Sequence, residues 1–414
     1  MNMPATNKKA ATKQRSIHTN KFTQTEDYLA DRYEFRLNIV SLSIEYRRIP
    51  EDETKADEFK PVNENAIFRE LHKANVTVSM AVLVALLRSD FATIFDPIDQ
   101  YFKELPKWDQ KTDYIKELAS YVHAVEKKEW QHHFKKHLVR TYVCAINQKY
   151  FNKQALILVQ PEQNSGKSTF LRFLCPPELT DYLAEDMTSD KDSRILLVKN
   201  FMINLDELAK WSKKDIDTIK SYFSKTQINE RLPYDRKNSV LIRRASFFGS
   251  TNRQDFLTDE TGSVRWLCFQ VGKIDWSYTK NVDINKVWSQ AKWLAENGFE
   301  YEMSPAEIQE NEKRNKKYFA MTIEIEYIVK FFEFDHIKEK HNFRTATEVM
   351  GTIYKLVDHR LSLNFIAIGK ALTFLGCPKG KEYDRYGYYL FVRPDFNPEN
   401  PKENSPDNEK NNTA

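Results

Sequence analysis

Three polar clusters in the sequence each follow a run of apolar residues, and their residue types suit the binding of phosphate and a metal ion. The first lies in residues 160–169 (QPEQNSGKST), directly after the run ALILV. In a phosphate-binding loop, backbone N–H groups surround the phosphates, a lysine meets the outer ones and a hydroxyl group holds Mg²⁺. Pro161 takes the place of the first glycine of such a loop. We expect contacts with ATP from Asn164, Ser165, Gly166, Lys167, Ser168 and Thr169, and with Mg²⁺ from Ser168.

The second cluster is the acidic pair Asp206 and Glu207, at the end of the apolar run FMINL. An acid at the end of a strand can hold Mg²⁺ through water, and a second acid beside it can orient and deprotonate the attacking water. The distance along the chain from Lys167 to this pair leaves room for a helix and a strand. We therefore assign Asp206 to the metal ion and Glu207 to catalysis.

The third cluster ends the run ASFFGSTN, where Asn252 could reach the γ-phosphate or the attacking water from a neighbouring strand. Further along, Arg265 follows a turn and precedes another apolar run. An arginine in such a place can neutralise a transferring phosphate, and we expect it to act in an adjacent subunit. A surface salt bridge is the alternative role for Arg265. The three clusters and Arg265 follow one another along the chain. Together they predict an enzyme that hydrolyses ATP, with Glu207, Asn252 and Arg265 as catalytic residues.

The elements that would position these clusters are short apolar runs that alternate with helical or loop segments. The runs are ALILV (155–159), RILLVKNFMINLDE (194–207), VLIRRASFFGSTN (240–252) and VRWLCFQV (264–271). They are too continuous for amphipathic edge strands, which indicates buried strands of an α/β sheet with helices on both faces. We predict an α/β fold whose core is a P-loop ATPase domain.

The regions on either side of this core have different patterns. Near the N-terminus, apolar and polar residues alternate as in a short strand pair, and apolar residues then recur at the three- and four-residue spacings of helices. After the core, helices followed by a β-ribbon fit a small winged-helix module. The predicted division is a disordered basic arm (1–25), a mainly helical N-terminal region (26–150), the ATPase core (151–275), a helical connector (276–322), a winged-helix-like domain (323–393) and a disordered tail (394–414).

The overall composition narrows the setting of the protein. The 414 residues carry 63 basic and 59 acidic side chains, so the charge balance alone does not indicate a nucleic-acid-binding protein. The four cysteines are far apart and form no C-x-x-C pair, which favours a reducing, cytoplasmic setting. No apolar run reaches the roughly 18 residues of a membrane span, so no membrane partner is expected.

Local clustering predicts a nucleic-acid contact in residues 219–245 (IKSYFSKTQINERLPYDRKNSVLIRRA). Basic side chains neutralise phosphates, and aromatic side chains such as Tyr222 and Phe223 stack on bases, which suits a single strand in a channel. Two of the arginines, Arg231 and Arg236, could instead be structural or sense the nucleotide. The residues that we select as nucleic-acid contacts are Lys220, Arg231, Arg236 and Lys237.

The C-terminal unit offers a second basic group around its expected recognition helix and wing. A winged helix can hold duplex DNA, as the helix-turn-helix proteins do, or it can dock a protein, and both alternatives remain open. The basic residues concerned are Arg360, Lys370, Lys379, Lys381, Arg385 and Arg393.

These motifs together resemble the virulence-associated E family of bacterial mobile-element and phage proteins, which is related to superfamily 3 helicases. The likeness covers roughly residues 25–275. Besides the phosphate loop, it includes DPIDQYFKELPKWDQ, LDEL, ERLPYDR, GSTN and FLTDETGSVRW. The combination is far more specific than the phosphate loop alone.

The resemblance implies a role for each matched residue. Lys167 and Ser168 correspond to Walker A, and Asp206 with Glu207 to Walker B. Asn252 corresponds to sensor 1 and Arg265 to the arginine finger. The chain departs from the family pattern at Pro161 and at Val264, where a first arginine often precedes the finger. Neither departure removes a group that hydrolysis needs.

Members of this group are typically ring-forming AAA+-type ATPases, often encoded near or fused to a primase. The resemblance therefore implies a bacterial or phage-encoded, ring-forming DNA helicase-like motor that replicates a mobile element. Its expected partners are single-stranded or forked DNA, further copies of the chain and a separate primase. One alternative is a regulatory or anti-phage defence ATPase that remodels a partner without unwinding DNA. A non-catalytic DNA-binding initiator is another alternative.

Overall fold

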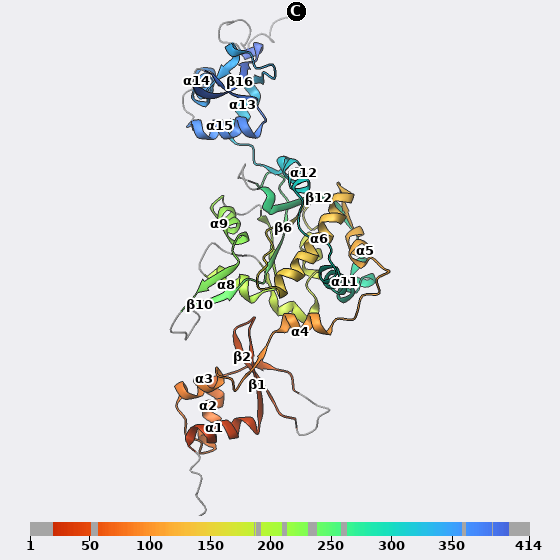
Figure 1. Ribbon diagram of the computed structural model, residues 1–414, viewed down its shortest axis with the longest axis vertical. Helices are drawn as coiled ribbons and strands as arrows, with labels where there is room; N and C mark the ends of the chain where they lie inside the picture. Colours follow the sequence, from red (N-terminus) through yellow and green to blue (C-terminus); the bar gives the residue numbers. More distant parts are fainter. Residues whose placement is uncertain are drawn as a thin grey trace, which may run out of the picture.

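The computed structural model describes residues 20–50, 57–185, 187, 192–208, 213–230, 238–257, 263–357, 362–382 and 384–396. Three lobes follow one another along the long axis of the molecule (Figure 1). The middle lobe is the largest and contains all three polar clusters. No helix within these ranges is both long and apolar enough to cross a membrane.

The N-terminal lobe is a small sheet packed against helices around its own hydrophobic core. Its elements are α1 (Lys21–Ala30), β1 (Tyr33–Asn38), β2 (Ser43–Arg48), β3 (Lys60–Pro61), α2 (Glu64–Lys73), α3 (Met80–Leu87) and β4 (Thr93–Phe95), and the strand order is β3-β2-β1-β4. The predicted strand pair is confirmed, because β1 and β2 pair antiparallel. Tyr33, Phe35 and Leu37 alternate toward the core and pack with the helices.

The central lobe is built on a six-stranded sheet, as expected for an α/β fold. Its strands, in spatial order, are β5 (Val122–Ala124), β12 (Trp266–Ile274), β6 (Ala155–Val159), β11 (Ser246–Thr251), β8 (Met202–Leu205) and β7 (Leu183–Glu185). All pairs are parallel except that of β5 with β12. Carboxyl ends of parallel strands lie at one edge of a sheet, so β6, β11 and β8 present their polar ends together.

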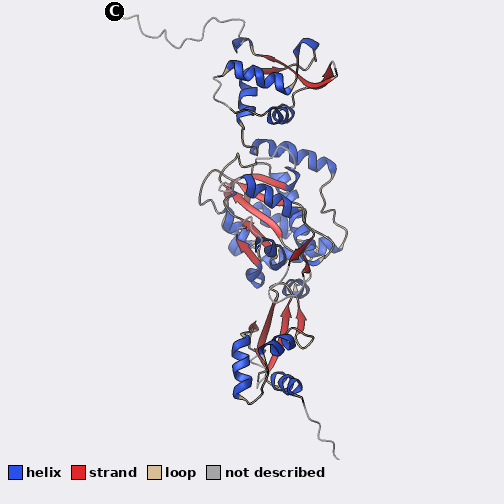
Figure 2. Ribbon diagram, turned by 90° about the vertical axis from the view of Figure 1, so that its left-hand side faces the viewer, coloured by secondary structure: helices blue, strands red, loops and turns tan. Residues whose placement is uncertain are grey.

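Helices cover both faces of this sheet, and Figure 2 shows the strands of the central lobe enclosed by them. Leu156 and Leu158 of β6 belong to one core cluster, whereas Ala155, Ile157 and Val159 belong to another. Successive strand residues point to opposite faces, which explains the division. The helices around the first cluster are α4 (Pro97–Glu104), α5 (Tyr114–Ser120), α6 (Lys127–Ile146), α7 (Lys167–Phe173), α10 (Tyr278–Asn281) and α11 (Ile284–Glu296), and those around the second are α8 (Asp192–Lys199) and α9 (Lys213–Phe223).

Two of the predicted strands begin later than their apolar runs suggest. The residues RILLV form part of α8, and only Met202–Leu205 of that run is a strand. Likewise, VLI belongs to a separate ribbon of β9 (Gln227–Glu230) and β10 (Ser239–Ile242), which precedes β11. A short apolar run does not by itself distinguish a buried strand from a buried helix. Leu197 and Val198 of α8 are buried like strand residues, so the error has a simple cause.

The C-terminal lobe follows α12 (Pro305–Asn315) and combines helices with a β-ribbon. Its core contains Ile328, Val349, Ile368, Leu372 and Leu390. The strand β16 pairs antiparallel with three others, and the hairpin of β15 and β16 forms the ribbon. The elements are α13 (Ile323–Phe331), β13 (Phe332–Phe334), β14 (Phe343–Arg344), α14 (Ala346–Leu356), α15 (Phe365–Phe374), β15 (Lys379–Glu382) and β16 (Arg385–Val392).

The packing around Gly249 generates a prediction about the sheet. A Cβ atom at Gly249 in β11 would lie 2.8 Å from the Leu205 carbonyl oxygen and 2.9 Å from Ile157 Cδ1. Overfilling a packed core costs roughly 1–3 kcal/mol, so Gly249→Ala should lower the free energy of unfolding by that amount. Urea denaturation followed by circular dichroism measures this change.

Gly272 provides a matched control, since it also lies in a strand of the same sheet. The nearest atom to a Cβ there would be the His123 carbonyl oxygen at 3.5 Å, an ordinary contact. We expect Gly272→Ala to unfold at the wild-type urea concentration. Equal stability of the Gly249→Ala protein and wild type would contradict the close packing of β11 between β6 and β8.

Candidate functional site

The loop after β6 makes a tight turn before α7 begins. The Gln160 N–H donates to the Thr251 carbonyl, which continues the pairing of β6 with β11 to the start of the loop. Asn164 and Gly166 have φ angles of 55° and 88°, in the left-handed region. Glycine and asparagine tolerate this region best. The chain therefore curls back to start α7 at Lys167, with Pro161 in place of the first glycine.

Lys167 lies over this loop and is largely buried. Its ammonium donates to the carbonyls of Gln160 (3.3 Å) and Glu162 (3.1 Å) and to Ser165 Oγ (2.9 Å). Burial lowers the pKa of Lys167, and the negative charges of Asp206 and Glu162 partly offset this effect. The ammonium group of Lys167 is thus held by the loop itself.

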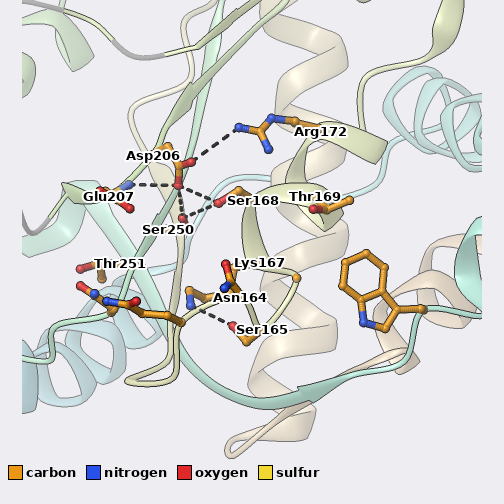
Figure 3. A pocket seen from close by; sticks show the side chains of 14 residues that line it. Asn164, Ser165, Lys167, Ser168, Thr169, Arg172, Asp206, Glu207, Ser250 and Thr251 are labelled. Carbon is orange, nitrogen blue, oxygen red and sulfur yellow. Dashed lines mark hydrogen bonds and ion pairs between the residues drawn. The ribbon is translucent and has the colours of Figure 1, made fainter.

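Asp206, which directly follows β8, contacts side chains from α7 and β11 (Figure 3). Its Oδ1 accepts hydrogen bonds from Ser168 Oγ and Ser250 Oγ, both at 2.7 Å, and from the Glu207 N–H at 3.0 Å. The Arg172 guanidinium lies 3.5 Å from Oδ2. Partial burial opposes ionisation of Asp206, but the hydrogen bonds outweigh it and lower the pKa of the carboxyl group. The site therefore holds a carboxylate beside a serine hydroxyl, which is a donor set that suits Mg²⁺.

Glu207 and Asn252 lie at the rim of the same site. Glu207 is exposed and has a φ of 48°, which is unusual for a residue with a side chain. Such backbone conformations cluster at functional sites. The cavity has a volume of about 420 Å³ and is lined by Gln163, Asn164, Ser165, Gly166, Lys167, Ser168, Thr169, Arg172, Asp206, Glu207, Ser250, Thr251, Asn252 and Trp276. The fold thus brings together every residue predicted to contact ATP or Mg²⁺, with Glu207 and Asn252.

Five lining residues were not among the predicted site residues, namely Gln163, Arg172, Ser250, Thr251 and Trp276. Arg172 also donates two hydrogen bonds to the Glu185 carboxylate, at 2.7 and 3.2 Å. It stands four residues after Ser168, so helical spacing places the two on one face of α7. Ser250 stands two residues before Asn252 at the end of β11. No motif in the sequence points to Trp276.

Arg265 lies at the other edge of the sheet from this cavity. It ends the short 3₁₀ turn Ser263–Arg265, and Trp266 after it pairs with Ala155, the first residue of β6. The loop that contains Lys167 begins after Val159, so the length of β6, roughly 13 Å at about 3.3 Å per residue, separates the two. Arg265 donates to Ser224 Oγ at 3.3 Å. Arg265 is therefore not one of the described residues that line the cavity.

The predicted nucleic-acid segment divides into two parts. Arg231, Arg236 and Lys237 lie outside the described residues, and their assignment stays a prediction. Lys220 on α9 is only 8% exposed, a burial that does not favour contact with a phosphate backbone. Tyr222 and Phe223 are buried in the core around α9, so the expectation that they stack on bases is wrong.

Arg243 and Arg244, from the same segment, are structural. The fully buried Arg243 guanidinium donates to the carbonyls of Asn152 (2.7 Å), Tyr222 (2.9 Å) and Phe223 (2.9 Å). Arg244 forms a salt bridge with Asp96 at 2.7 Å and thereby ties this segment to the start of α4. These arginines hold the core together and are not exposed to a strand of nucleic acid.

Replacement of Arg243 tests this structural role. Arg243→Met should lower the free energy of unfolding by roughly 3 kcal/mol or more, because three buried carbonyl groups lose their donor at about 1–3 kcal/mol each. Thermal unfolding followed by circular dichroism measures the loss. Arg253→Ala is the control, since Arg253 pairs with Asp255 at the surface and such pairs contribute little. An Arg243→Met protein as stable as wild type would contradict the structural role.

Comparison with known proteins gives one family and several solved structures of low sequence identity. A family model described as the virulence-associated protein E-like domain matches residues 102–320. The apo structure of the NrS-1 C-terminal region is 11% identical with a TM-score of 0.49, and the match covers 91% of this chain and 100% of that one. An A-form apo structure of that region is 11% identical with a TM-score of 0.48, over 90% and 99%. None of the curated proteins matches the chain.

Proposed function

The chain belongs to the virulence-associated protein E-like family, and on that premise we propose that it is an ATP hydrolase that uses Mg²⁺. One observation carries this proposal: Asp206 contacts Ser168 and Ser250 at 2.7 Å beside the buried Lys167. A carboxylate, a hydroxyl and a lysine at the end of a curled loop match the needs of a nucleotide phosphate with its metal ion.

The residues of the cavity divide the work of hydrolysis. Lys167 would exchange its present loop acceptors for the outer phosphate oxygens, and Ser168 with Asp206 would hold the metal ion. When bound, Mg²⁺ neutralises charge on the phosphates. Glu207, exposed at the rim, would orient the attacking water and accept its proton. The water oxygen bonds to the γ-phosphorus, the bond to the β,γ-bridging oxygen breaks, and ADP and phosphate leave. Asn252 would help to position the water.

A ring of identical subunits would complete this site. Arg265 lies at the opposite edge of its own sheet from its own cavity. Within one chain it is too far to meet the transferring phosphate. We propose that Arg265 of a neighbouring copy supplies the missing positive charge, as arginine fingers do in trans.

We further propose that this ring acts as a helicase-like motor on single-stranded or forked DNA during replication of a mobile element or phage-related island, with a separate primase. Among the described residues, those of the C-terminal lobe are the best candidates for the DNA contact. In its ribbon, Lys379 pairs with Tyr388 and Lys381 with Tyr386, so two lysines and two tyrosines share one face. Tyr386 is 81% exposed. Basic and aromatic side chains together suit phosphates and bases.

The burial of Tyr222, Phe223 and Lys220 favours a second candidate function. Because these side chains do not face a channel, the ATPase could remodel a protein partner in regulation or anti-phage defence without unwinding DNA. Strand displacement of a forked DNA substrate, with ATP turnover measured in parallel, separates the two functions. Unwinding supports the helicase, whereas ATP turnover that is indifferent to DNA supports the second candidate.

Replacement of Glu207 tests the assignment of the catalytic base. Glu207→Gln should bind ATP with wild-type affinity but turn it over roughly 10²–10⁴-fold more slowly, since an amide keeps the shape but does not accept the proton. Phosphate release and equilibrium binding measure the two quantities. Asp255→Asn is the control at an exposed carboxylate of the same lobe and should retain activity. Normal turnover by Glu207→Gln would place the base elsewhere.

Mixed subunits test the ring and the role of Arg265. Lys167→Ala and Arg265→Ala should each abolish hydrolysis, yet their mixture should regain activity. Some boundaries then pair the intact loop of an Arg265→Ala subunit with the intact finger of a Lys167→Ala subunit. In a random equal mixture of a cyclic ring, about a quarter of the boundaries are of this kind. Phosphate release from the mixture measures the recovery.

The control mixture combines Lys167→Ala with Glu207→Gln subunits, in which every finger is intact and every cavity is defective. It should remain inactive at all ratios. If the Arg265→Ala and Lys167→Ala proteins never complement each other, or if wild-type turnover per chain does not change with protein concentration, the ring proposal is contradicted.

A further inference from the structure

The cavity around the phosphate loop has one side chain that phosphate and metal binding do not explain. Among the described residues that line it, Trp276 is the only aromatic one, and the others are polar or glycine. We infer that Trp276 is the surface on which the base of the bound nucleotide stacks. This inference rests on the proposed function. It assigns a binding surface to the nucleotide base, which the phosphate loop does not contact.

The indole of Trp276 lies directly against the phosphate loop. A Cβ atom at Gly166 would be 2.7 Å from Trp276 Cζ2 and 3.2 Å from Cε2. Real Cβ atoms do not approach this closely, so only glycine at position 166 leaves room for the ring. The ring therefore borders the point at which the loop becomes α7, immediately beside the backbone expected to hold the phosphates.

Neighbouring residues fix the turn that carries Trp276. The Asp275 N–H donates to the Tyr121 carbonyl at 2.8 Å, and the Asp275 carboxylate accepts from the N–H and the hydroxyl of Ser277. Thr279 Oγ1 donates to the Trp276 carbonyl at 2.9 Å. The turn between β12 and α10 is thus hydrogen-bonded on both sides of Trp276, which fixes the backbone that carries the indole.

A second aromatic ring supports the indole from inside the protein. The Tyr278 ring lies nearly parallel to that of Trp276, at 20° and 6.5 Å between centroids. Tyr278 is fully buried and makes edge-on contacts with Phe170 (5.3 Å) and Phe173 (4.8 Å) of α7. Trp276 itself is 49% exposed. A large apolar ring with a packed interior partner and half of its surface free is a platform suited to a flat aromatic ligand.

The distribution of charge in the cavity sets the direction of the ligand. The carboxylates Asp206 and Glu207 lie at the ends of strands, and the hydroxyls of Ser168 and Ser250 contact Asp206 there. The side of the cavity near Asp206 suits a metal ion and the reacting phosphate. Its described residues have no apolar surface on which a nucleotide base could stack. Trp276 touches Gly166 instead, at the start of α7. A nucleoside triphosphate therefore fits with its outer phosphates toward Asp206 and its base on the indole.

The test compares ATP with inorganic tripolyphosphate, which has the phosphates without the base, by calorimetry with Mg²⁺. Wild type should bind ATP about tenfold or more tightly than tripolyphosphate, as one base–aromatic stack allows. Trp276→Ala should lose that preference by weakening ATP alone, and Trp276→Phe should keep most of it. Trp108→Ala is the control, because Trp108 contacts Trp293 away from this cavity and should affect neither ligand.

The possible results separate this inference from the proposed function. If wild type binds both ligands equally, or if Trp276→Ala binds ATP like wild type, the base does not stack on Trp276 although the phosphate site stands. Equal weakening of both ligands by Trp276→Ala would mean that the ring only supports the loop, which also overturns the inference. If wild type binds neither ligand, the proposed function fails, and the inference fails with it. The wild-type comparison is informative even if the alanine protein does not fold.

Discussion

The hydrogen bonds from Ser168 and Ser250 to one oxygen of Asp206 are the contact on which the account depends. Ser168 lies at the start of α7, Ser250 near the end of β11 and Asp206 directly after β8, and they meet only because β11 lies between β6 and β8. The two hydroxyls offset the cost of partly burying a carboxylate, which keeps it ionised. The order of strands thus creates an anionic oxygen cluster beside a buried lysine.

The rest of the central lobe holds Ser168, Asp206 and Ser250 in place. Both faces of the sheet are packed, and Gly249 allows β11 to approach its neighbours closely just before the polar end of the strand. On the other side of the loop, Tyr278 supports Trp276. The cavity therefore has an acidic end and an aromatic end, separated by the loop, and this polarity matches that of a nucleoside triphosphate with its metal ion.

The sequence predicted the parts of the site that depend on local pattern. Strands β6 and β11, the loop with Lys167, and the acids after β8 follow from apolar runs that end in particular polar residues. The α8 segment was assigned to a strand because five apolar or basic residues in a row have no distinguishing period. Trp276 could not be predicted, since its approach to Gly166 arises only when the turn after β12 folds against the loop.

The roles of Tyr222 and Phe223 were misjudged for a related reason: charge and aromatic content do not reveal which side chains the fold buries. The proposed magnesium–nucleotide site at Asp206 is tested most directly by calorimetric titration of a non-hydrolysable ATP analogue with Mg²⁺ and with EDTA. We expect a single site per chain in Mg²⁺ and an affinity at least about tenfold weaker in EDTA, since Ser168 and Asp206 would hold the metal ion that neutralises charge on the phosphates. Equal affinity in the two conditions, or no binding in either, would contradict it.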